Sequence, residues 1–448
     1  MAKLTLKQAA LWCGGYVDPK YENIEFFGAN NDTRIIKPGQ LFIVLQGARD
    51  GHDFIPMAME KGAAAALCSR SVGDYPCIIV EDPRIALGII AREERKRLQA
   101  RVVGITGSVG KSTTKEMVAS VLSTTYRTGK TPVNHNNDIG MPMAILAMEE
   151  DTEVMVLEMG MNHFREMAYL SEIAMPDIGI IVNVGTMHIE HLGSRQGIRQ
   201  AKLELLEGMA PESKLLLNGD DDMLNPLNRE ISQKLTYFGM ADSCGVRAVD
   251  IHQAPGLLTF TVQAGETVFP VELALEGMHF VPDAMAAVAV GLQLGVSPEK
   301  IARGLWNFKN MAGRQEVYEK NGFTIINDCY NAGPESMAAS LAVLGNKPGR
   351  KIAVLGDMLE LGDCAPAEHY KLGQIAAKNA ELILVYGPNG CHVVAGAGEK
   401  ARCFDTREAA AEALRAAALP GDTILFKGSR GMRMERILEK FLEDRAHL

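Results

Sequence analysis

The chain has 448 residues, too many for one compact core, and at about 150 residues per domain it predicts about three domains. Hydrophobic residues make up 47% of it and charged residues 23%, which is ordinary for a soluble globular protein. Its net charge of −9, with no basic domain to offset it, argues against a protein that binds nucleic acid.

Eight cysteines are scattered along the chain without a Cys-x-x-Cys pair, which argues against a disulfide framework or a structural zinc site. The N-terminal residues lack the apolar core of a signal peptide. No uncharged apolar run approaches the ~20 residues of a membrane span. We therefore expect a cytoplasmic protein without membrane insertion.

Residues 1–97 mix short strands, at 40–45 and 77–80, with helices at 54–61 and 91–99. This pattern predicts a small N-terminal domain of mixed α/β structure.

From residue 98 to 312 strand and helix patterns alternate, which indicates a central domain with a parallel sheet covered by helices. The pattern predicts a hairpin that turns at residues 264–266, hence a β-rich insertion, followed by an apolar helix at 283–294. The parallel strands are expected at 102–106, 154–158, 179–184 and 214–218.

Residues 313–448 repeat the alternation and predict a second doubly wound, Rossmann-like domain. In such sheets ligands bind beyond the carboxyl ends of the strands, where Asp328 and Lys427 stand. We expect a ligand cleft between the two α/β domains. The strands are expected at 324–328, 352–355, 382–386 and 423–426.

The segment 101–115 is the most informative of the chain, because a β-branched strand, a glycine-containing turn and a helix start follow one another. Backbone N–H groups of such a turn can cradle a phosphate, a lysine adds a cation, and hydroxyl groups bind Mg²⁺. The usual P-loop pattern would place its first glycine at Ile105, whereas this chain has Gly104 and Gly107. The alternative is that the Gly-Lys-Ser sequence occurs by chance in a loop, and the strand before it and the helix after it argue against this. The nucleotide-binding residues are then Gly107, Ser108, Val109, Gly110, Lys111, Ser112 and Thr113.

Two further strand ends carry candidate metal ligands. Glu158 closes an apolar strand, where it either holds the Mg²⁺ of a nucleotide or caps the next helix. His188, Glu190 and His191 follow the next strand and either ligate a second divalent ion or form a solvated loop.

Asn136 and Asn137 lie in an amide-rich loop that either only turns the chain or contacts phosphate or substrate. Lys202 lies in an amphipathic helix at 197–208, and its spacing alone indicates a surface lysine.

In the third region, Asp328 and Asn331 either cap a helix or hydrogen-bond a ribose or base. A basic cluster at the last helix forms a solvated face or clamps an anion. Its members are Lys427, Arg430, Arg433 and Arg436.

Many segments together carry a family resemblance: 32–34, 47–54, 104–113, 136–142, 158–160, 183–188, 201–204, 277–279, 328–336, 356–362 and 427–430. Over essentially the whole chain they resemble the Mur ligases, the ATP-dependent amide-bond ligases of peptidoglycan precursor synthesis, and most closely the MurF type. The glycine spacing of residues 104–113 is also that of this family.

The resemblance implies that ATP phosphorylates the carboxylate of UDP-N-acetylmuramoyl-tripeptide and that the amine of D-alanyl-D-alanine attacks the acyl phosphate. Lys111 and two Mg²⁺ ions would stabilise the developing charge. By resemblance, Ser112 and Glu158 hold one ion and His188 helps hold the other. Lys202 matches a lysine that is carbamylated in this family, which would make it a catalytic residue beside Lys111 and His188.

The resemblance also implies that residues 1–97 hold the UDP moiety and that the third domain closes on ATP. ATP contacts are expected from His279, Arg314, Asp328 and Asn331. Substrate contacts are expected from Asp32, Thr33, Arg34, Asn136, Asn137, Lys427, Ser429 and Arg430. One departure is Asp283, which stands where the family usually has asparagine. We expect a monomer.

Two rival functions remain. The sister MurE-type ligases add the third amino acid, but the Asp-Asn-Pro-Arg segment with which they grip a diamino acid is absent from this sequence. A P-loop switch protein would hydrolyse nucleotide without any peptide substrate.

Overall fold

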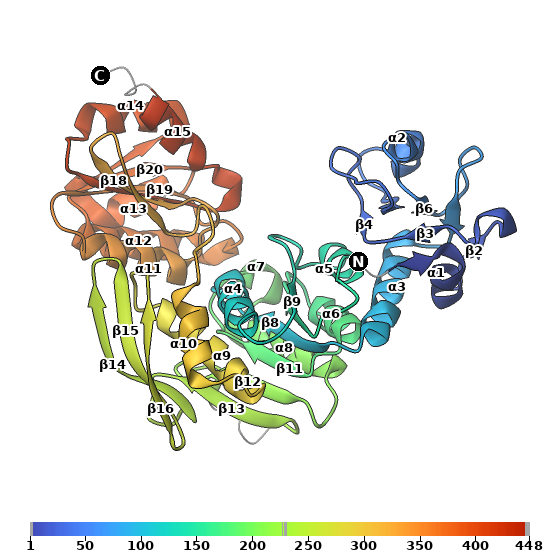
Figure 1. The fold of residues 1–448 in the computed structure, drawn as a ribbon. Coiled ribbons are helices and arrows are strands. Elements are labelled where there is room, and N and C mark those ends of the chain that lie inside the picture. The colour runs from blue at the N-terminus through green and yellow to red at the C-terminus, as the bar shows by residue number, and fades with distance from the viewer. Residues whose placement is uncertain (1–2, 226, 228–230, 444–448) are drawn as a thin grey trace.

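The computed structural model describes residues 3–225, 227 and 231–443. The N-terminal domain (blue) and the C-terminal domain (orange to red) lie on different sides of the central domain (Figure 1). The expected three-domain α/β organisation is confirmed. In the described part of the chain, no helix is both long and apolar enough to cross a membrane.

The N-terminal domain is built on a five-stranded sheet of order β2-β7-β6-β5-β4, in which only β2 and β7 pair antiparallel. A separate antiparallel pair joins β1 to β3. The strands are β1 (Leu4–Thr5), β2 (Tyr16–Val17), β3 (Glu25–Phe26), β4 (Ala29–Asn30), β5 (Leu41–Ile43), β6 (Ala65–Cys68) and β7 (Cys77–Ile79). The helices are α1 (Leu6–Cys13), α2 (Ile55–Glu60) and α3 (Pro83–Leu98).

Helix α3 leads into the central domain and is longer than the predicted helix at 91–99. Asp82 caps its first turn by accepting from the N–H groups of Arg84 (2.8 Å) and Ile85 (3.3 Å), and Pro83 suits the first helical position. Buried side chains of α3 belong to one hydrophobic core that continues into the central domain.

The central domain contains a nine-stranded sheet of order β16-β15-β14-β13-β12-β11-β8-β10-β9. Its strands are β8 (Arg101–Thr106), β9 (Thr128–Lys130), β10 (Val154–Glu158), β11 (Ile178–Ile181), β12 (Lys214–Asn218), β13 (Lys234–Gly239), β14 (Val246–Ala254), β15 (Leu257–Ala264) and β16 (Thr267–Leu273). Strands β9 to β14 pair parallel in this order, whereas β14, β15 and β16 pair antiparallel. The predicted hairpin therefore extends the parallel sheet and forms no sheet of its own.

Helices cover both faces of this sheet, so Val102 packs into one core while Val103 and Ile105 pack into the other. The helices are α4 (Lys111–Leu122), α5 (Gly140–Leu146), α6 (Glu166–Ala174), α7 (Ile189–Leu192), α8 (Arg195–Leu203), α9 (Phe280–Gln293) and α10 (Pro298–Trp306). Residues 204–208, expected to continue the helix of Lys202, form a 3₁₀ turn.

The C-terminal domain has a six-stranded sheet of order β17-β18-β22-β19-β20-β21, with only β17 antiparallel. The predicted doubly wound arrangement is confirmed, with two strands, β17 and β21, that were not predicted. The strands are β17 (Glu316–Lys320), β18 (Phe323–Asp328), β19 (Lys351–Gly356), β20 (Leu382–Tyr386), β21 (Ala401–Phe404) and β22 (Thr423–Lys427). The helices are α11 (Pro334–Gly345), α12 (Ala365–Asn379), α13 (Gly390–Ala397), α14 (Arg407–Ala417) and α15 (Glu435–Glu443).

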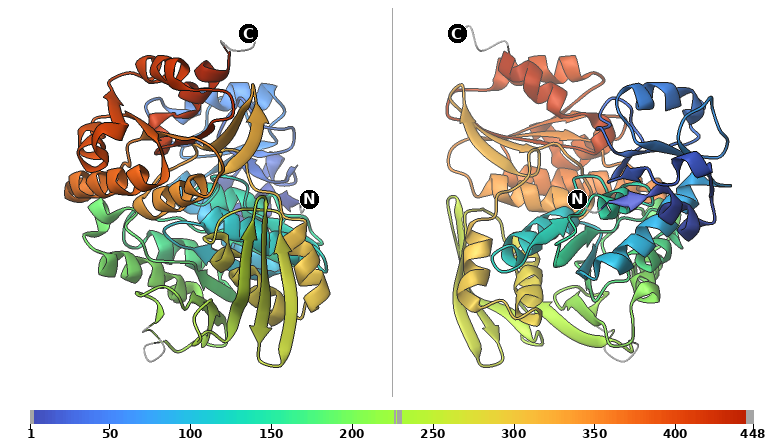
Figure 2. Two further views of the ribbon diagram at one scale, coloured as in Figure 1. Left: turned by 90° about the vertical axis from the view of Figure 1, so that its left-hand side faces the viewer. Right: turned by 45° about the vertical axis from the view of Figure 1, so that its right-hand side comes forward.

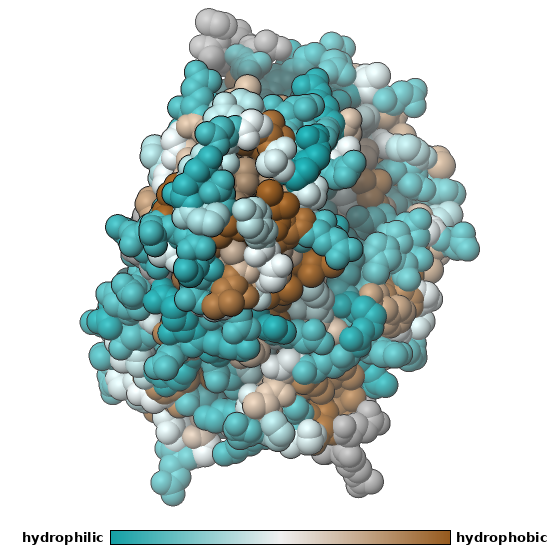
Figure 3. Space-filling model, turned by 90° about the vertical axis from the view of Figure 1, so that its right-hand side faces the viewer, coloured by the Kyte–Doolittle hydropathy of each residue, from teal (hydrophilic) through white to brown (hydrophobic). Residues whose placement is uncertain are grey.

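The strands β14 to β16 reach the C-terminal domain, which lies above them (Figures 1 and 2). There Glu276 pairs with Lys347 (2.6 Å), and its carbonyl accepts from Gln315 Nε2 (2.6 Å). The face turned to the viewer in Figure 3 is mostly hydrophilic, with apolar side chains in its middle.

Candidate active site

The phosphate-binding turn joins β8 to α4 as predicted. Gly110 precedes α4 in the left-handed conformation (φ +83°), and a Cβ atom there would lie 2.6 Å from Asp283 Oδ1. Both the backbone conformation and the close approach of Asp283 therefore favour glycine at this position. The N–H groups of residues 111–113 open α4 without partners inside the helix, an arrangement that suits a phosphate.

Asn183 fixes the shape of this turn. Its Oδ1 accepts from the N–H groups of Ser108 (3.0 Å) and Val109 (2.9 Å), and its Nδ2 donates to the Val109 carbonyl (2.9 Å). Sequence reasoning did not assign this role. The available signal was an amide residue just beyond β11, the strand that pairs with β8.

Lys111 Nζ lies over the same turn and donates to the carbonyls of Gly107 (2.7 Å) and Ser108 (3.1 Å). Burial lowers the pKa of Lys111, while the Glu158 carboxylate acts in the opposite direction. Because anionic oxygens are stronger acceptors than carbonyls, this ammonium group is well placed for a phosphate.

Glu158 ends β10, and its carboxylate is buried. Its Oε1 accepts from Asn136 Nδ2 (2.9 Å), whereas its Oε2 has no hydrogen-bond partner and lies 3.7 Å from Lys115 Nζ. The next helix starts at Glu166, so the alternative that Glu158 caps it is wrong. A buried carboxylate oxygen with free lone pairs fits a divalent cation.

His188 follows β11 with a left-handed backbone (φ +64°), and its Nδ1 lies 2.6 Å from Glu360 Oε2 of the C-terminal domain. Glu190 is exposed, and the His191 ring packs on His163 instead, at 4.7 Å between centroids. The suggested ion site of two histidines and a glutamate is therefore wrong. Among the residues described, no three His, Cys, Asp or Glu side chains gather as metal ligands.

Lys202 is only 2% exposed, which contradicts the surface position that its spacing indicated. Within the described part of the chain, Lys202 Nζ makes no hydrogen bond or ion pair. Burial lowers the pKa of Lys202 well below its usual value, and the Lys111 cation adds to this, while Asp221 opposes it. Burial thus favours the neutral amine over the ammonium form of this lysine.

Arg314 reaches from the C-terminal domain to the P-loop. Its Nη2 donates to Ser112 Oγ (3.0 Å), and its guanidinium group stacks on the Tyr330 ring, 3.8 Å from the centroid. A basic group of the third domain thus meets a hydroxyl group of the phosphate-binding helix.

Asp328 and Lys427 form a buried ion pair (2.7 Å) at the carboxyl ends of the adjacent strands β18 and β22. Ser340 Oγ also donates to Asp328, at 2.5 Å. The residue that precedes α11 is Gly333, so neither Asp328 nor Asn331 caps that helix. The burial of Lys427 likewise contradicts a fully solvated basic helix face.

Asn331 Oδ1 accepts from the N–H group of Arg430 (3.3 Å) across the two strand ends. His279 packs on Phe280 at the start of α9, and burial lowers the pKa of His279 to about 4. The imidazole is therefore neutral at physiological pH and can both donate and accept a hydrogen bond.

The amide-rich loop turns the chain, and its contact with phosphate or substrate stays a prediction. Asn137 Oδ1 accepts from the Gly140 N–H group (2.7 Å) and so turns the chain into α5, while Asn136 holds Glu158. Asp283, the departure from the family, is buried and accepts from Thr114 Oγ1 (2.8 Å). Burial raises the pKa of Asp283 to about 7, so this carboxyl group is largely neutral below that pH.

One cavity of about 910 Å³ collects most of these groups from the central and C-terminal domains, whereas Gly107 and Lys202 are not among the residues that line it. The expected cleft between the two α/β domains is thus present. Predicted residues that line it are Ser108, Val109, Gly110, Lys111, Ser112, Thr113, Asn136, Asn137, Glu158, His188, His279, Arg314, Asp328, Asn331 and Lys427.

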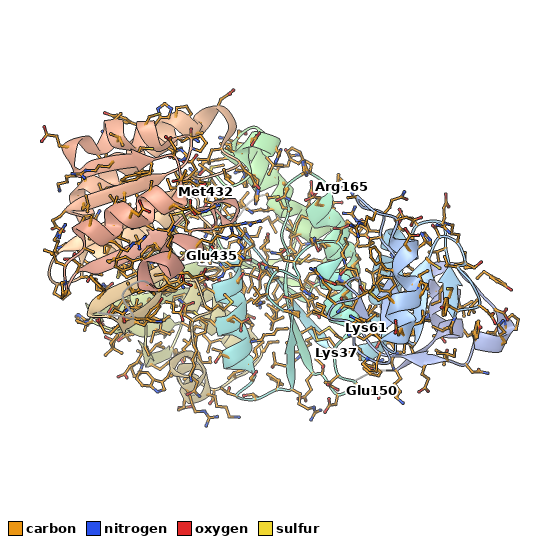
Figure 4. The ribbon with its side chains drawn as sticks, turned by 90° about the horizontal axis from the view of Figure 1, so that it is seen from above. Lys37, Lys61, Glu150, Arg165, Met432 and Glu435 are labelled. Atoms are coloured by element: carbon orange, nitrogen blue, oxygen red, sulfur yellow. The ribbon has the colours of Figure 1, made fainter. Side chains whose placement is uncertain are left out.

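Five predicted substrate-binding residues lie outside the lining of this cavity. In the N-terminal domain the Asp32 carboxylate binds the Arg34 guanidinium group (2.6 Å), and the Thr33 carbonyl accepts from Lys61 Nζ (2.7 Å). Lys61 is labelled on that domain, to the right in Figure 4.

The other two, Ser429 and Arg430, belong to the C-terminal domain. Ser429 Oγ accepts from the Leu359 N–H group (2.9 Å) and is buried, so its contacts are structural. Arg430 pairs with Glu435 (3.2 Å), which Figure 4 labels on the C-terminal domain, to the left.

The chain matches two family models, the Mur ligase middle domain over residues 105–291 and the glutamate ligase domain of Mur ligases over residues 313–430. It is 40% identical to the UDP-N-acetylmuramoyl-tripeptide--D-alanyl-D-alanine ligase of Bacillus subtilis, with 99% of each chain covered. A crystal structure of MurF from Acinetobacter baumannii superposes with a TM-score of 0.92, at 32% identity and 99% coverage of both chains. MurF ligase from Thermotoga maritima in complex with ADP gives a TM-score of 0.83, at 30% identity, with 94% of this chain and 98% of that chain covered. The first family model includes the phosphate-binding turn, and the relatives match over all three domains. This chain therefore belongs to the Mur ligase family.

Proposed function

We propose that this protein joins D-alanyl-D-alanine to UDP-N-acetylmuramoyl-tripeptide, with the conversion of ATP to ADP and phosphate. The observation that carries the proposal is the shared cavity, where a P-loop and a buried carboxylate oxygen without a hydrogen-bond partner, both of the central domain, face basic groups of the C-terminal domain. The names of the relatives give the substrates, and the ADP complex of the Thermotoga maritima ligase supports nucleotide binding. The same relatives disfavour the MurE-type alternative.

In this proposal ATP lies across the turn at residues 107–110. Lys111 neutralises the transferred phosphate, and the first N–H groups of α4 bind its oxygens. Arg314 exchanges part of its contact with Ser112 for a phosphate oxygen as the third domain closes. His279, Asp328 and Asn331 complete the nucleotide contacts.

Carboxyl activation and amide formation follow in order. The tripeptide carboxylate attacks the terminal phosphate of ATP to give an acyl phosphate and ADP. The amine of D-alanyl-D-alanine attacks the acyl carbon, phosphate leaves, and the amine loses a proton. Lys427 and Arg430 are proposed to hold the dipeptide carboxylate, and Asn136 and Asn137 the substrate peptide.

Two Mg²⁺ ions are proposed, and the donors present fit them. Glu158 has a buried carboxylate oxygen without a hydrogen-bond partner, and Ser112 and His188 line the same cavity. When bound, the ions would neutralise phosphate charge. Lys202 fits a carbamate, since only a neutral amine adds CO₂, with release of one proton, and burial favours that neutral amine.

The N-terminal domain, residues 1–97, is proposed to bind the UDP moiety near Asp32, Thr33 and Arg34. Arg84, at the start of α3, lines the active-site cavity and pairs with Asp138, so this region reaches the proposed reaction centre. We take residues 98–312 as the ATP-binding domain and 313–448 as the domain for ATP and dipeptide. We propose a cytoplasmic monomer, in keeping with the eight free cysteines.

The decisive assay supplies ATP, Mg²⁺, UDP-N-acetylmuramoyl-tripeptide and D-alanyl-D-alanine and measures phosphate. Release that requires both peptide substrates is expected. Equal release without either one would identify a nucleotide switch and overturn the proposal.

Lys202 has its own test. Lys202→Ala should lose activity that short-chain carboxylates partly restore, because they replace the anion that the carbamate supplies. Full activity of Lys202→Ala without such additives would rule the carbamate out.

A further inference from the structure

The segment that carries His188 is held by the C-terminal domain. His188 and Glu360 are 172 positions apart in the chain, yet His188 Nδ1 and Glu360 Oε2 are 2.6 Å apart. Thr186 donates from both N and Oγ1 to Glu335 Oε1 (3.0 and 3.1 Å). Gly362 packs on Glu190, since a Cβ atom built on it would lie 3.3 Å from Glu190 Cγ. Residues 186–190 therefore meet the third domain at three points.

Both members of the His188–Glu360 pair have an unusual backbone. His188 has φ +64° and Glu360 has φ +62°, the left-handed region that non-glycine residues rarely adopt. Such conformations persist only where the surroundings hold them, and they are enriched at functional sites. Here the two strained residues hold each other across a domain boundary.

The chemistry of the pair is directional. A carboxylate only accepts hydrogen bonds, so the proton of a neutral imidazole must sit on Nδ1. Nε2 then keeps its lone pair, and His188 lines the active-site cavity. A carboxylate on the far nitrogen fixes the tautomer and the ring orientation of a metal-binding histidine and increases its basicity.

We propose that Glu360 is a positioning residue, which holds His188 across the domain boundary in the tautomer that leaves Nε2 available to the ATP cavity. The proposal rests on the proposed function. It means that the cavity acquires its histidine ligand only when the C-terminal domain is docked. ATP turnover is thereby coupled to closure of the domain that brings the dipeptide.

The first test needs neither metal nor substrate. Nitrogen NMR of ¹⁵N-histidine-labelled full-length protein, at about pH 8 where imidazoles are neutral, reports the tautomer of each ring. The His188 signal is assigned by its absence from His188→Gln. We expect the Nδ1–H form in the wild type and a mixture dominated by Nε2–H in Glu360→Ala. An unchanged His188 signal in Glu360→Ala would overturn the proposal.

The second test is kinetic. Glu360→Ala should lower kcat by ~10- to 100-fold with a smaller effect on the KM for D-alanyl-D-alanine, and Glu360→Gln, which can still accept from Nδ1, should recover part of the loss. Glu368→Ala is the matched control, because Glu368 lies in the same domain and, among the described residues, its carboxylate pairs with Lys371 and with no group of the active site. It should retain wild-type rates.

A double variant separates positioning from simple stabilisation. If Glu360 acts through His188, Glu360→Ala should add almost nothing to the defect of His188→Ala. Fully additive losses would contradict the proposal. Failure of the proposed function is distinguishable, because the wild type would then show no peptide-dependent phosphate release, while the NMR result would still test the pair.

Discussion

Asp283 gives a sharp test of how burial controls charge beside the P-loop. Its carboxyl group is 5% exposed, accepts a hydrogen bond from Thr114, and faces Gly110. Burial raises the pKa of Asp283 to about 7, from 3.8 in an exposed chain, and the Arg314 cation only partly opposes this. Between these two values the folded protein keeps a proton that the unfolded chain has lost.

The sign of the effect follows from this difference. The free energy of unfolding falls as the pH rises from about 4 to about 7, and the loss persists above that range. At about 1.4 kcal/mol per pH unit the total reaches about 4 kcal/mol, an upper bound since the site can relax. Asp283→Asn, which keeps the shape without the charge, avoids this loss.

The assay is denaturant unfolding of the full-length wild type and Asp283→Asn at about pH 5 and about pH 8. The stability advantage of the variant should grow by up to about 3 kcal/mol between the two pH values. Asp405→Asn makes the same substitution at an exposed position and should show no such growth. An advantage of Asp283→Asn that is equal at both pH values, or smaller at the higher one, would refute the reasoning.

Three other changes probe the turn and the cores. Lys111→Ala should reduce peptide-dependent phosphate release by about 10²- to 10³-fold or more, because it removes a group that stabilises developing charge. The melting temperature should be nearly unchanged. Full turnover would show that Lys111 does not bind the phosphate. Gly110→Ala should lower the free energy of unfolding by about 1–2 kcal/mol, because alanine disfavours the left-handed backbone. It should also weaken ATP binding measured by calorimetry, because the added methyl group would meet Asp283. Wild-type affinity would show that the turn adapts. Phe441→Ala should destabilise the C-terminal domain by about 3–5 kcal/mol in denaturant unfolding, since Phe441 is fully buried against Phe323 at 5.2 Å; a loss below about 1 kcal/mol would show that this core refills the space.

Local patterns were sufficient for the elements on which the site is built. A β-branched run, a glycine turn and a helix start identified residues 101–115, because a phosphate-binding turn is coded by consecutive residues. Alternating patterns likewise predicted the strands β10, β12 and β15, along with the hairpin partner β16. Boundaries were less certain: α3 begins eight residues before the predicted start, at a cap that Asp82 supplies.

Patterns failed where a residue's environment comes from distant parts of the chain. Lys202 looks like a surface lysine in its own helix, yet the fold buries it near Lys111. Asn183 falls near the end of the strand predicted at 179–184, yet its side chain shapes a turn 75 residues earlier because β11 pairs with β8. Family resemblance, not spacing, drew attention to Lys202.

The sequence by itself determined the doubly wound domains, the phosphate-binding turn and the acidic strand end at Glu158, since each is encoded within one short segment. Only the tertiary structure decided that one carboxylate oxygen of Glu158 has no hydrogen-bond partner, that Asp328 is paired with Lys427, and that His188 is held by Glu360. The physical reason is that burial and charge pairing depend on which sheet edges the fold brings together. The order of residues along the chain does not by itself give the distances between side chains on different strands.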